Sequence, residues 1–376
     1  MSPDVKTRFV LIGGFLGAGK TTLIGKLARR YVAAGKRVGI ITNDQADNLV
    51  DTQNLRSQGF DVGEVAGACF CCSFDDLVAT ADRFASEGAP DILLAEPVGS
   101  CTDLVATVIL PLQELLGDRF ELAPFGVLLK PSHGRRILAS GDKDDQKKRS
   151  GFSPQAEYIF RKQLEEADYL MIGRRDQLSD QEVDDLQTLL AQVGDDVPII
   201  AVSPQTGDGV DEVLGYIESP MVAGRRLLEI DYDTYAVGEA ELGWVNLSAM
   251  LSAAEPVEMD VLVVELVSAI AKQIMKDDGQ IAHLKASVLA GDTQAVANVV
   301  SNDSEVDMGL SSNRSASGGM QVIVNARVAM DPALLEDICR QQLELIRQAR
   351  NLTIESVSAQ SLRPGRPVPT HRVIRD

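Results

Sequence analysis

The stretch from Arg8 to Ala34, RFVLIGGFLGAGKTTLIGKLARRYVAA, decides the fold of this 376-residue chain. It opens with a short apolar run, Arg8 to Ile12, which predicts a buried strand. Thr21 to Ala34 has the apolar spacing of a helix, and Gly35 predicts its end. Between them, GFLGAGKT at Gly14–Thr21 fits the pattern G-x-x-x-x-G-K-[ST], and it has the strand before and the helix after that this phosphate-binding pattern requires.

The residue types in this loop suit phosphate binding. Glycines let successive backbone N–H groups wrap a phosphate at the N-terminus of a helix. Lys20 would contact the β- and γ-phosphates, and the Thr21 hydroxyl would bind Mg²⁺. The alternative is a glycine-rich turn that opens an ordinary helix. The candidate nucleotide-binding residues here are Gly14, Gly17, Ala18, Gly19, Lys20, Thr21 and Thr22.

Further short apolar runs follow along the first half of the chain and alternate with helical segments. This alternation predicts an α/β fold, a doubly wound and mostly parallel sheet with helices on both faces. The expected strands after the first one cover residues 37–42, 91–95, 125–129, 169–172 and 197–202.

The α/β pattern breaks near residues 217–224. We therefore expect a first domain over 1–219 and a smaller C-terminal α+β domain over 220–376. The mixed-charge segment 141–150 is expected to be a surface loop, and the proline-containing tail 363–376 to be flexible. In the second domain we expect helices at 261–275 and 332–349, strands at 282–289, 295–300 and 321–329, and a loop at 311–319.

Composition and charge exclude several functions. With 36 Lys and Arg against 55 Asp and Glu, the net charge is -19, which argues against nucleic-acid and anionic-membrane partners. No run approaches the roughly 18 apolar residues of a membrane-spanning helix. Five cysteines are too few for a disulfide framework, and the N-terminal residues lack the pattern of a secretory signal. We therefore expect a cytoplasmic protein with free thiols.

Three of the five cysteines crowd into four positions, in the sequence GACFCC at Gly67–Cys72. Soft thiolates favour Zn²⁺, Cu(I) or similar ions, and three ligands leave one coordination position open. Cys69, Cys71 and Cys72 are therefore candidate ligands of a transition metal. The alternatives are a redox pair or inert buried cysteines. Cys101 is interpreted as a small buried residue rather than a fourth ligand, and His133 as a polar surface histidine rather than a ligand.

A carboxylate, Glu96, ends the apolar run 91–95, and Gly99 follows three residues later. At the carboxyl end of a strand beside a phosphate loop, such an acid can hold Mg²⁺ or its water, and Gly99 can donate its N–H group to a γ-phosphate. Asn43 and Asp44, which follow the strand 37–42, are weaker candidates for the same role, with Asp44 as the candidate ligand of Mg²⁺.

These motifs together resemble the CobW-type metallochaperone P-loop GTPases, which are relatives of the urease- and hydrogenase-maturation GTPases. The resemblance rests on GGFLGAGKTTL, on the Cys-x-Cys-Cys motif and on the strand that ends in Glu-x-x-Gly, and it covers about residues 8–216. It implies that Lys20 and Thr21 hold phosphate and Mg²⁺, and that Lys20 and Glu96 are catalytic. It also implies that the three clustered cysteines are metal ligands.

The resemblance further implies a function. Members of the family serve zinc, cobalt, nickel and iron pathways, so we expect a GTPase that uses GTP and Mg²⁺ and binds Zn²⁺ or Co²⁺. GTP hydrolysis would drive delivery of the metal to a client metalloprotein, with the segments around Asp44 and Glu96 responding to the γ-phosphate. A homodimer stays open as its assembly.

The chain departs from the family at the base-binding motif. Asn-Lys-x-Asp should follow the strand 169–172, but Gly173–Asp176 reads GRRD, so only Asp176 is retained to accept hydrogen bonds from guanine. The later loop has Pro204, which lacks an N–H group for the base. Two other functions stay open: an ATP-using P-loop enzyme, and a metal- or corrinoid-binding nucleotide switch with little hydrolysis.

Overall fold

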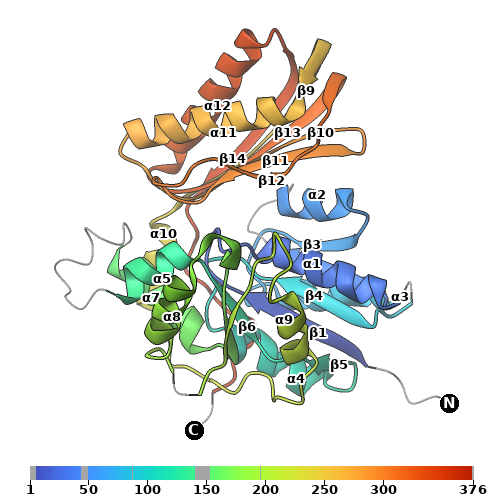
Figure 1. Ribbon diagram of the computed structural model, residues 1–376, viewed down its shortest axis with the longest axis vertical. Coiled ribbons are helices and arrows are strands. Elements are labelled where there is room, and N and C mark those ends of the chain that lie inside the picture. Colours follow the sequence, from blue (N-terminus) through green and yellow to red (C-terminus); the bar gives the residue numbers. More distant parts are fainter. Residues whose placement is uncertain (1–5, 44–49, 87, 140–152, 195, 375–376) are drawn as a thin grey trace. The chain divides into compact units, whose positions relative to one another are not determined.

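The computed structural model describes residues 6–43, 50–86, 88–139, 153–194 and 196–374 (Figure 1). The chain forms two compact units. The first comprises Met1–Gln45, Phe60–Gly238 and Arg366–Asp376, and the second comprises Ala46–Gly59 and Glu239–Gly365. The sequence places the boundary between residues 219 and 220. In the structure the first unit continues to Gly238. The C-terminal segment Arg366–Asp376 also belongs to the first unit, and the N-terminal segment Ala46–Gly59 belongs to the second.

The first unit is built on an eight-stranded sheet in which every recorded strand pair is parallel. The strand order is β3-β2-β4-β1-β6-β7-β8, with β5 paired to β1. This confirms the predicted α/β class, and the six predicted strands all form, whereas β3 and β5 were not predicted. The strands are β1 Thr7–Gly13, β2 Val38–Asn43, β3 Asp61–Val65, β4 Ile92–Glu96, β5 Phe120–Leu122, β6 Gly126–Leu129, β7 Tyr169–Ile172 and β8 Ile199–Ala201.

Helices connect these strands and flank the sheet (Figure 1). In α1 the predicted apolar face is buried through Leu23, Leu27 and Tyr31. The predicted loop 141–150 lies outside the described residues. The helices are α1 Lys20–Ala33, α3 Phe74–Ser86, the π-helix η1 Val105–Ile109, α4 Leu110–Leu116, α5 Pro131–Leu138, α7 Pro154–Glu165, the 3₁₀ helix η2 Arg175–Gln177, α8 Asp180–Leu190, α9 Val210–Ile217 and α10 Tyr232–Ala240.

The parallel register brings the candidate site residues to one edge of this sheet. β4 lies between β1 and β2, with Leu11 opposite Ala95 and Thr42 opposite Glu96. Three neighbouring strands therefore end together, and ligands of doubly wound sheets bind outside the carboxyl ends of the strands.

The second unit is a six-stranded antiparallel sheet in the order β12-β11-β10-β13-β9-β14. The apolar sides of the long helices α11 and α12 belong to the same core as the inward residues of the sheet. Its elements are α2 Val50–Ser57, β9 Gly243–Glu258, α11 Met259–Lys276, β10 Gln280–Ala290, β11 Thr293–Val299, β12 Asp307–Leu310, β13 Ser315–Ala329, α12 Pro332–Ala349 and β14 Thr353–Leu362.

Several parts of the second unit were not predicted. β9 contains many Ser and Ala residues, which favour strands weakly, but it is paired on both sides, with β13 and β14. The expected loop 311–319 is wrong in its second half, because β13 already begins at Ser315 and Gly319 pairs with Ser252. The helix α2 packs here because Val50 joins Val296 and Ile323 in a small apolar cluster.

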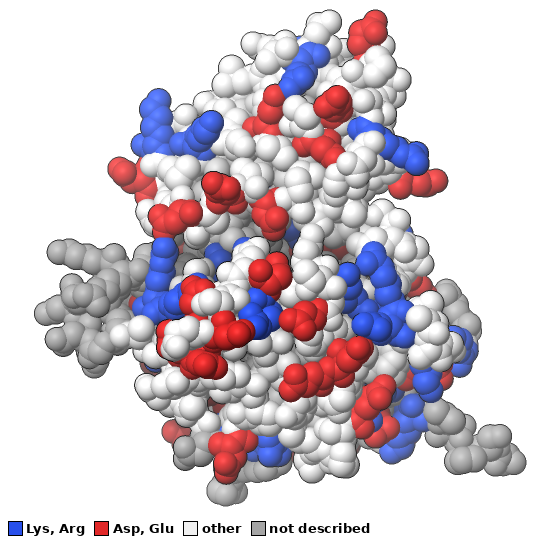
Figure 2. Space-filling view, viewed as in Figure 1, with Lys and Arg blue, Asp and Glu red and all other residues white. Residues whose placement is uncertain are grey.

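The surface carries mixed charge. Figure 2 shows acidic and basic side chains interspersed on the face in view, so the local field changes sign over short distances there. Among the described residues, no helix combines the length and apolarity needed to cross a membrane.

Candidate nucleotide and metal site

The glycines of residues 14–21, the glycine loop, have backbone conformations that other residues rarely adopt. Gly14, Gly17 and Gly19 have φ angles of 136°, 70° and 100°. A Cβ atom on Gly14 would also lie 2.3 Å from the Leu128 carbonyl oxygen. The loop therefore needs glycine at position 14, since a side chain at that position would collide with β6.

Lys20 begins α1 and folds back over the glycine loop. Its Nζ atom donates a hydrogen bond to the Gly14 carbonyl oxygen at 2.9 Å, and the residue is only 6% exposed. The ammonium group therefore lies against the backbone of the glycine loop, where the sequence motif predicts that phosphate binds.

Thr21 and Glu96 meet at the end of β4. The Thr21 hydroxyl donates to Glu96 Oε1 at 3.0 Å, and both residues are buried. This pair joins the first turn of α1 to the strand-end acid and places two hard oxygen donors side by side. Asp44, the other predicted Mg²⁺ residue, lies outside the described residues.

Gly99 packs against the glycine loop. A Cβ atom on Gly99 would lie 2.7 Å from Leu16 Cδ2 and 3.0 Å from the Leu16 backbone nitrogen. A larger residue would force this segment away from the loop, so glycine permits this close approach.

The three clustered cysteines converge after β3. The Sγ–Sγ distances are 3.0 Å for Cys69 and Cys71, 3.4 Å for Cys69 and Cys72, and 3.6 Å for Cys71 and Cys72. A Zn–S bond of about 2.3 Å requires tetrahedral sulfurs about 3.8 Å apart, so the spacing is short by tenths of an ångström. Among the described residues these cysteines form the group of potential metal ligands that the structure brings together.

The three thiols lie within hydrogen-bonding distance of one another, and this shifts their pKa values in different directions. Hydrogen bonds from Cys101, Cys71 and Cys72 hold the pKa of Cys69 well below its usual range. The same contacts, led by that with Cys101, raise the pKa of Cys71, and the hydrogen bond with Cys69 raises that of Cys72 to about 11. Cys101 is buried, as expected.

Asn43, which the sequence analysis named only together with Asp44 as a weaker candidate for the Mg²⁺ site, holds residues 66–73, the thiol-bearing loop. At the end of β2 its Nδ2 donates to the carbonyl oxygens of Val65 at 2.9 Å and Ala68 at 2.7 Å. Its Oδ1 accepts from the Phe70 N–H group at 2.8 Å. The sequence placed Asn43 directly after a strand, but it did not predict that this amide would hold the loop that carries the cysteines.

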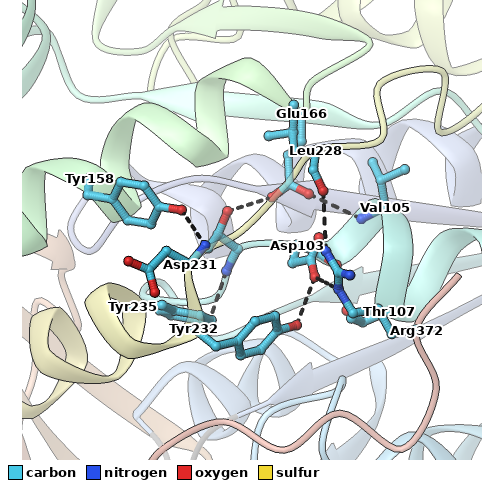
Figure 3. A network of polar contacts seen from close by, with 11 residues as sticks. Asp103, Val105, Thr107, Tyr158, Glu166, Leu228, Asp231, Tyr232, Tyr235 and Arg372 are labelled. Carbon is cyan, nitrogen blue, oxygen red and sulfur yellow. Dashed lines mark hydrogen bonds and ion pairs between the residues drawn. The ribbon is translucent and has the colours of Figure 1, made fainter. Parts of the chain in front are cut away.

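Residues 97–103, the connecting loop, run from Glu96 to η1 and are held by α7. The Gln163 side chain donates to the carbonyl oxygens of Gly99 at 3.0 Å and Cys101 at 2.8 Å. Glu166 Oε1 accepts from the Thr102 hydroxyl, and burial raises the pKa of Glu166 to about 8. The polar contacts at the end of this loop continue through Asp103, Tyr232 and Arg372 (Figure 3).

The C-terminal segment also reaches the thiol cluster, and its expected flexibility is wrong for the described part. The Thr370 N–H group donates to the Cys71 carbonyl oxygen at 2.8 Å, and the Val368 N–H group donates to Cys72 Sγ at 3.3 Å. The His371 ring packs edge-on against Phe74, with centroids 5.0 Å apart. These contacts join residues almost 300 positions apart, which no local pattern indicates.

Three positions that the sequence analysis linked to base binding lie in the loops after β7 and β8. A Cβ atom on Gly173 would lie 3.3 Å from the Ala18 carbonyl oxygen, so a side chain at this position would touch the glycine loop. Asp176 is exposed in η2. Pro204 is buried directly after Ser203, whose Oγ accepts from the Thr206 N–H group at 3.1 Å.

His133 is not at the surface, so that expectation is wrong. It is 2% exposed, and its ring packs against Phe15 and Phe160 with centroids 5.7 and 6.3 Å apart. Burial lowers its pKa well below the usual range. His133 therefore supports the aromatic packing beneath the glycine loop.

Comparison with known proteins gives matches over the same part of the chain. Residues 8–201 match the family described as CobW/HypB/UreG, nucleotide-binding domain. The chain is 38% identical over 97 residues to the zinc chaperone CobW of Sinorhizobium sp., and 33% identical over 94 residues to the zinc chaperone YeiR of Escherichia coli (strain K12). These alignments cover 24% and 25% of this chain and span only 27% and 28% of those relatives.

A solved structure, the Zn(II)-bound YjiA GTPase from E. coli, matches over 90% of this chain and 99% of that chain, with 15% identity and a TM-score of 0.37.

Fold and site define a parallel α/β nucleotide-binding protein with a thiol cluster at the carboxyl edge of its sheet. The family match extends over more than half of the residues. The chain belongs to the CobW/HypB/UreG family of P-loop GTPases, which confirms the resemblance seen in the motifs.

Proposed function

We propose that this protein is a metallochaperone that hydrolyses GTP, holds a transition metal on Cys69, Cys71 and Cys72, and couples hydrolysis to delivery of the metal. The observation that carries the proposal is the arrangement of β2 and β4. These paired strands end in Asn43, which holds the thiol-bearing loop, and in Glu96, which is hydrogen-bonded to Thr21. A change at the phosphate site therefore has a short path to the metal ligands.

The glycine loop would bind the phosphates through its backbone N–H groups. Lys20 would exchange its hydrogen bond with the Gly14 carbonyl oxygen for bonds to the β- and γ-phosphate oxygens. Gly99 would donate its N–H group to the γ-phosphate, which is how the connecting loop would detect the triphosphate.

Mg²⁺ fits the pair formed by Thr21 and Glu96. Hydroxyl and carboxylate oxygens are the hard donors that Mg²⁺ prefers, and here they lie 3.0 Å apart. We propose that Thr21 and Glu96 hold the ion, with Asp44 as the further candidate. When bound, Mg²⁺ would neutralise charge on the transferred phosphate. Glu96 would in addition orient the attacking water from the end of β4.

A comparison of wild-type protein with Glu96→Gln tests the hydrolytic part of this proposal. We expect GTP turnover in the variant to fall by about 10²-fold or more, because the strand-end acid acts on the ion or on the water. GTP affinity should change by less than about tenfold, since binding rests mainly on the glycine loop. Turnover is measured as GDP release and affinity by fluorescent-nucleotide titration.

Glu121→Gln, at an exposed carboxylate of β5, serves as the matched control and should behave as wild type. Unchanged turnover in Glu96→Gln would remove Glu96 from the mechanism. A parallel collapse of GTP affinity would mean that the residue maintains the fold of the site.

The metal is the cargo of this proposal. Three thiolates suit Zn²⁺ or Co²⁺, and two relatives are named as zinc chaperones, so we propose Zn²⁺ as the first metal to test. The receiver would be a client metalloprotein. A cytoplasmic location and a homodimer stay predictions.

The preference of the protein for guanine over adenine nucleotides also needs a test. Rejecting adenine requires buried groups that the wrong base leaves unpaired, each worth about 1–3 kcal/mol. Asp176 can accept from guanine N1–H and N2–H, but Gly173 removes a bracing side chain and Pro204 offers no donor. We predict that GTP binds more tightly than ATP by only about one to two orders of magnitude, or about 1.4–2.8 kcal/mol.

Asp176→Ala should bind the two nucleotides almost equally in competitive titrations against a fluorescent nucleotide. Asp184→Ala, at an exposed position of α8, is the matched control and should keep the preference for GTP. Tighter binding of ATP than GTP by the wild-type protein would overturn the GTP assignment and favour an ATP-using enzyme.

A further inference from the structure

The C-terminal residues 366–374, the strap, lie against the thiol-bearing loop. Thr370 joins the two backbones, since its N–H group donates to the Cys71 carbonyl oxygen at 2.8 Å and its hydroxyl to the Cys72 carbonyl oxygen at 3.2 Å. A third bond reaches a sulfur, because the Val368 N–H group donates to Cys72 Sγ at 3.3 Å. The strap and the thiol-bearing loop belong to the same compact unit.

We propose that the strap is part of the metal site, where the Val368 N–H group stabilises Cys72 as a metal-bound thiolate. This inference rests on the proposed metal function. A thiolate bound to a metal keeps lone pairs that accept hydrogen bonds, and bonds to ionised acceptors are the stronger ones. Such partners orient the ligands and tune the metal affinity. Cys72 is the least buried of the three clustered cysteines, so its sulfur has the least protection from the rest of the loop.

The sequence of the strap leaves a single backbone donor at this point. Pro367 and Pro369 have no N–H group, so Val368 carries the only backbone N–H group of residues 367–369. The residue before a proline is restricted to extended backbone conformations, which limits where this N–H group can point. The Val368 residue is 72% exposed, so it contacts the site through its backbone rather than by burying its side chain.

Ion pairs on both sides of Val368 hold the strap in place. Arg366 pairs with Asp233, and Arg372 Nε donates to Asp103 Oδ2 at 2.7 Å (Figure 3). The second pair is shielded from water on one side, because the Asp103 side chain is only 1% exposed. The strap is therefore ordered by its own contacts, and little conformational freedom is lost when the Val368 N–H group bonds to a metal-bound sulfur.

Two substitutions at one position separate the backbone donor from the side chain. Val368→Pro removes the N–H group and suits an extended backbone, whereas Val368→Ala keeps the N–H group and shortens an exposed side chain. In anaerobic full-length protein, we expect Val368→Pro to bind Zn²⁺ about tenfold more weakly or worse in competition with a chelator, because loss of a hydrogen-bond partner of a ligand costs about 10–100-fold. Val368→Ala, the conservative variant, should retain the wild-type affinity.

Cobalt absorption gives a readout that a loss of packing alone would not move. A hydrogen bond lowers the energy of the sulfur lone pair, so its loss shifts the thiolate-to-Co²⁺ charge-transfer bands to longer wavelength. We expect this shift in Val368→Pro but not in Val368→Ala. The bands should persist in both variants, because the three cysteines remain in place.

A measurement on the wild-type chain covers the case in which Val368→Pro does not fold. Protein labelled with ¹⁵N-valine is loaded with ¹¹³Cd²⁺, and the Val368 amide signal is identified by its absence from the spectrum of Val368→Ala. We expect this amide proton to show scalar coupling to ¹¹³Cd, transmitted through the hydrogen bond to Cys72 Sγ.

Zinc affinity or cobalt bands of folded Val368→Pro equal to those of wild type would overturn the role of the strap and leave the three-cysteine site intact. A Val368 amide proton without coupling to ¹¹³Cd would do the same. Wild-type protein that shows no thiolate charge-transfer bands with Co²⁺ would instead overturn the proposed metal function, and this inference with it.

Discussion

Lys20→Ala is expected to lose GTP hydrolysis and to bind GTP about 10–100-fold more weakly. Lys20 is buried over the glycine loop, where its ammonium group would form charged hydrogen bonds to the β- and γ-phosphates. Bonds of this kind are worth about 1.5–3 kcal/mol in binding. Hydrolysis should fall further, by about 10³-fold or more, because charge on the γ-phosphoryl oxygens is redistributed in the transition state.

Lys26→Ala is the matched control, since Lys26 lies on the same helix, two turns past its start, and outside the glycine loop. It should retain both the turnover and the affinity of wild type. Turnover at the wild-type rate in Lys20→Ala would contradict the whole nucleotide mechanism. The rates are measured as phosphate release, and the affinities by titration of a fluorescent GTP analogue.

Replacement of Cys69, Cys71 and Cys72 by Ser should lower Co²⁺ and Zn²⁺ affinity by about three orders of magnitude or more. Thiolate ligation supplies most of the free energy of such sites, and hydroxyls at neutral pH do not replace it. In wild type, added Co²⁺ should produce thiolate charge-transfer absorption, and the triple variant should not show it. Cys339→Ser is the control and should keep the bands.

The same titration has a predicted pH dependence. The pKa of Cys71 is raised and that of Cys72 is about 11, so these thiols carry protons at neutral pH that the metal must displace. Affinity should therefore fall as the pH is lowered. Identical spectra of wild type and the triple variant would show that the cysteines serve only packing.

The first unit was predicted well from local sequence patterns, because each of its motifs spans only a few consecutive residues. The strand before Gly14, the helix after Lys20 and the strand that ends in Glu96 all form as predicted. The second unit was predicted less fully. Its long strand β9, which lies next to the edge strand β14, is stabilised by two partners from distant parts of the chain, and its Ser- and Ala-rich sequence carries little local signal.

In the candidate site, too, contacts between distant parts of the chain could not be predicted from local patterns. The contacts of Asn43 with the loop after β3 follow from the strand order β3-β2-β4, which pairs β2 directly with β3. A single sequence does not specify that order. Thr370 and Val368 also contact the thiol-bearing loop from almost 300 positions away in the sequence, and no local pattern predicts such contacts.

Zinc affinity in different nucleotide states tests the central claim most directly. Wild-type protein with Mg²⁺ is titrated with Zn²⁺ against a competing chelator, once with a non-hydrolysable GTP analogue and once with GDP. The account predicts affinities that differ by about tenfold or more, a coupling of about 1.4 kcal/mol, with zinc changing the affinity for the GTP analogue relative to GDP by the same factor. Equal zinc affinities in the two states would contradict coupling between the nucleotide and the metal.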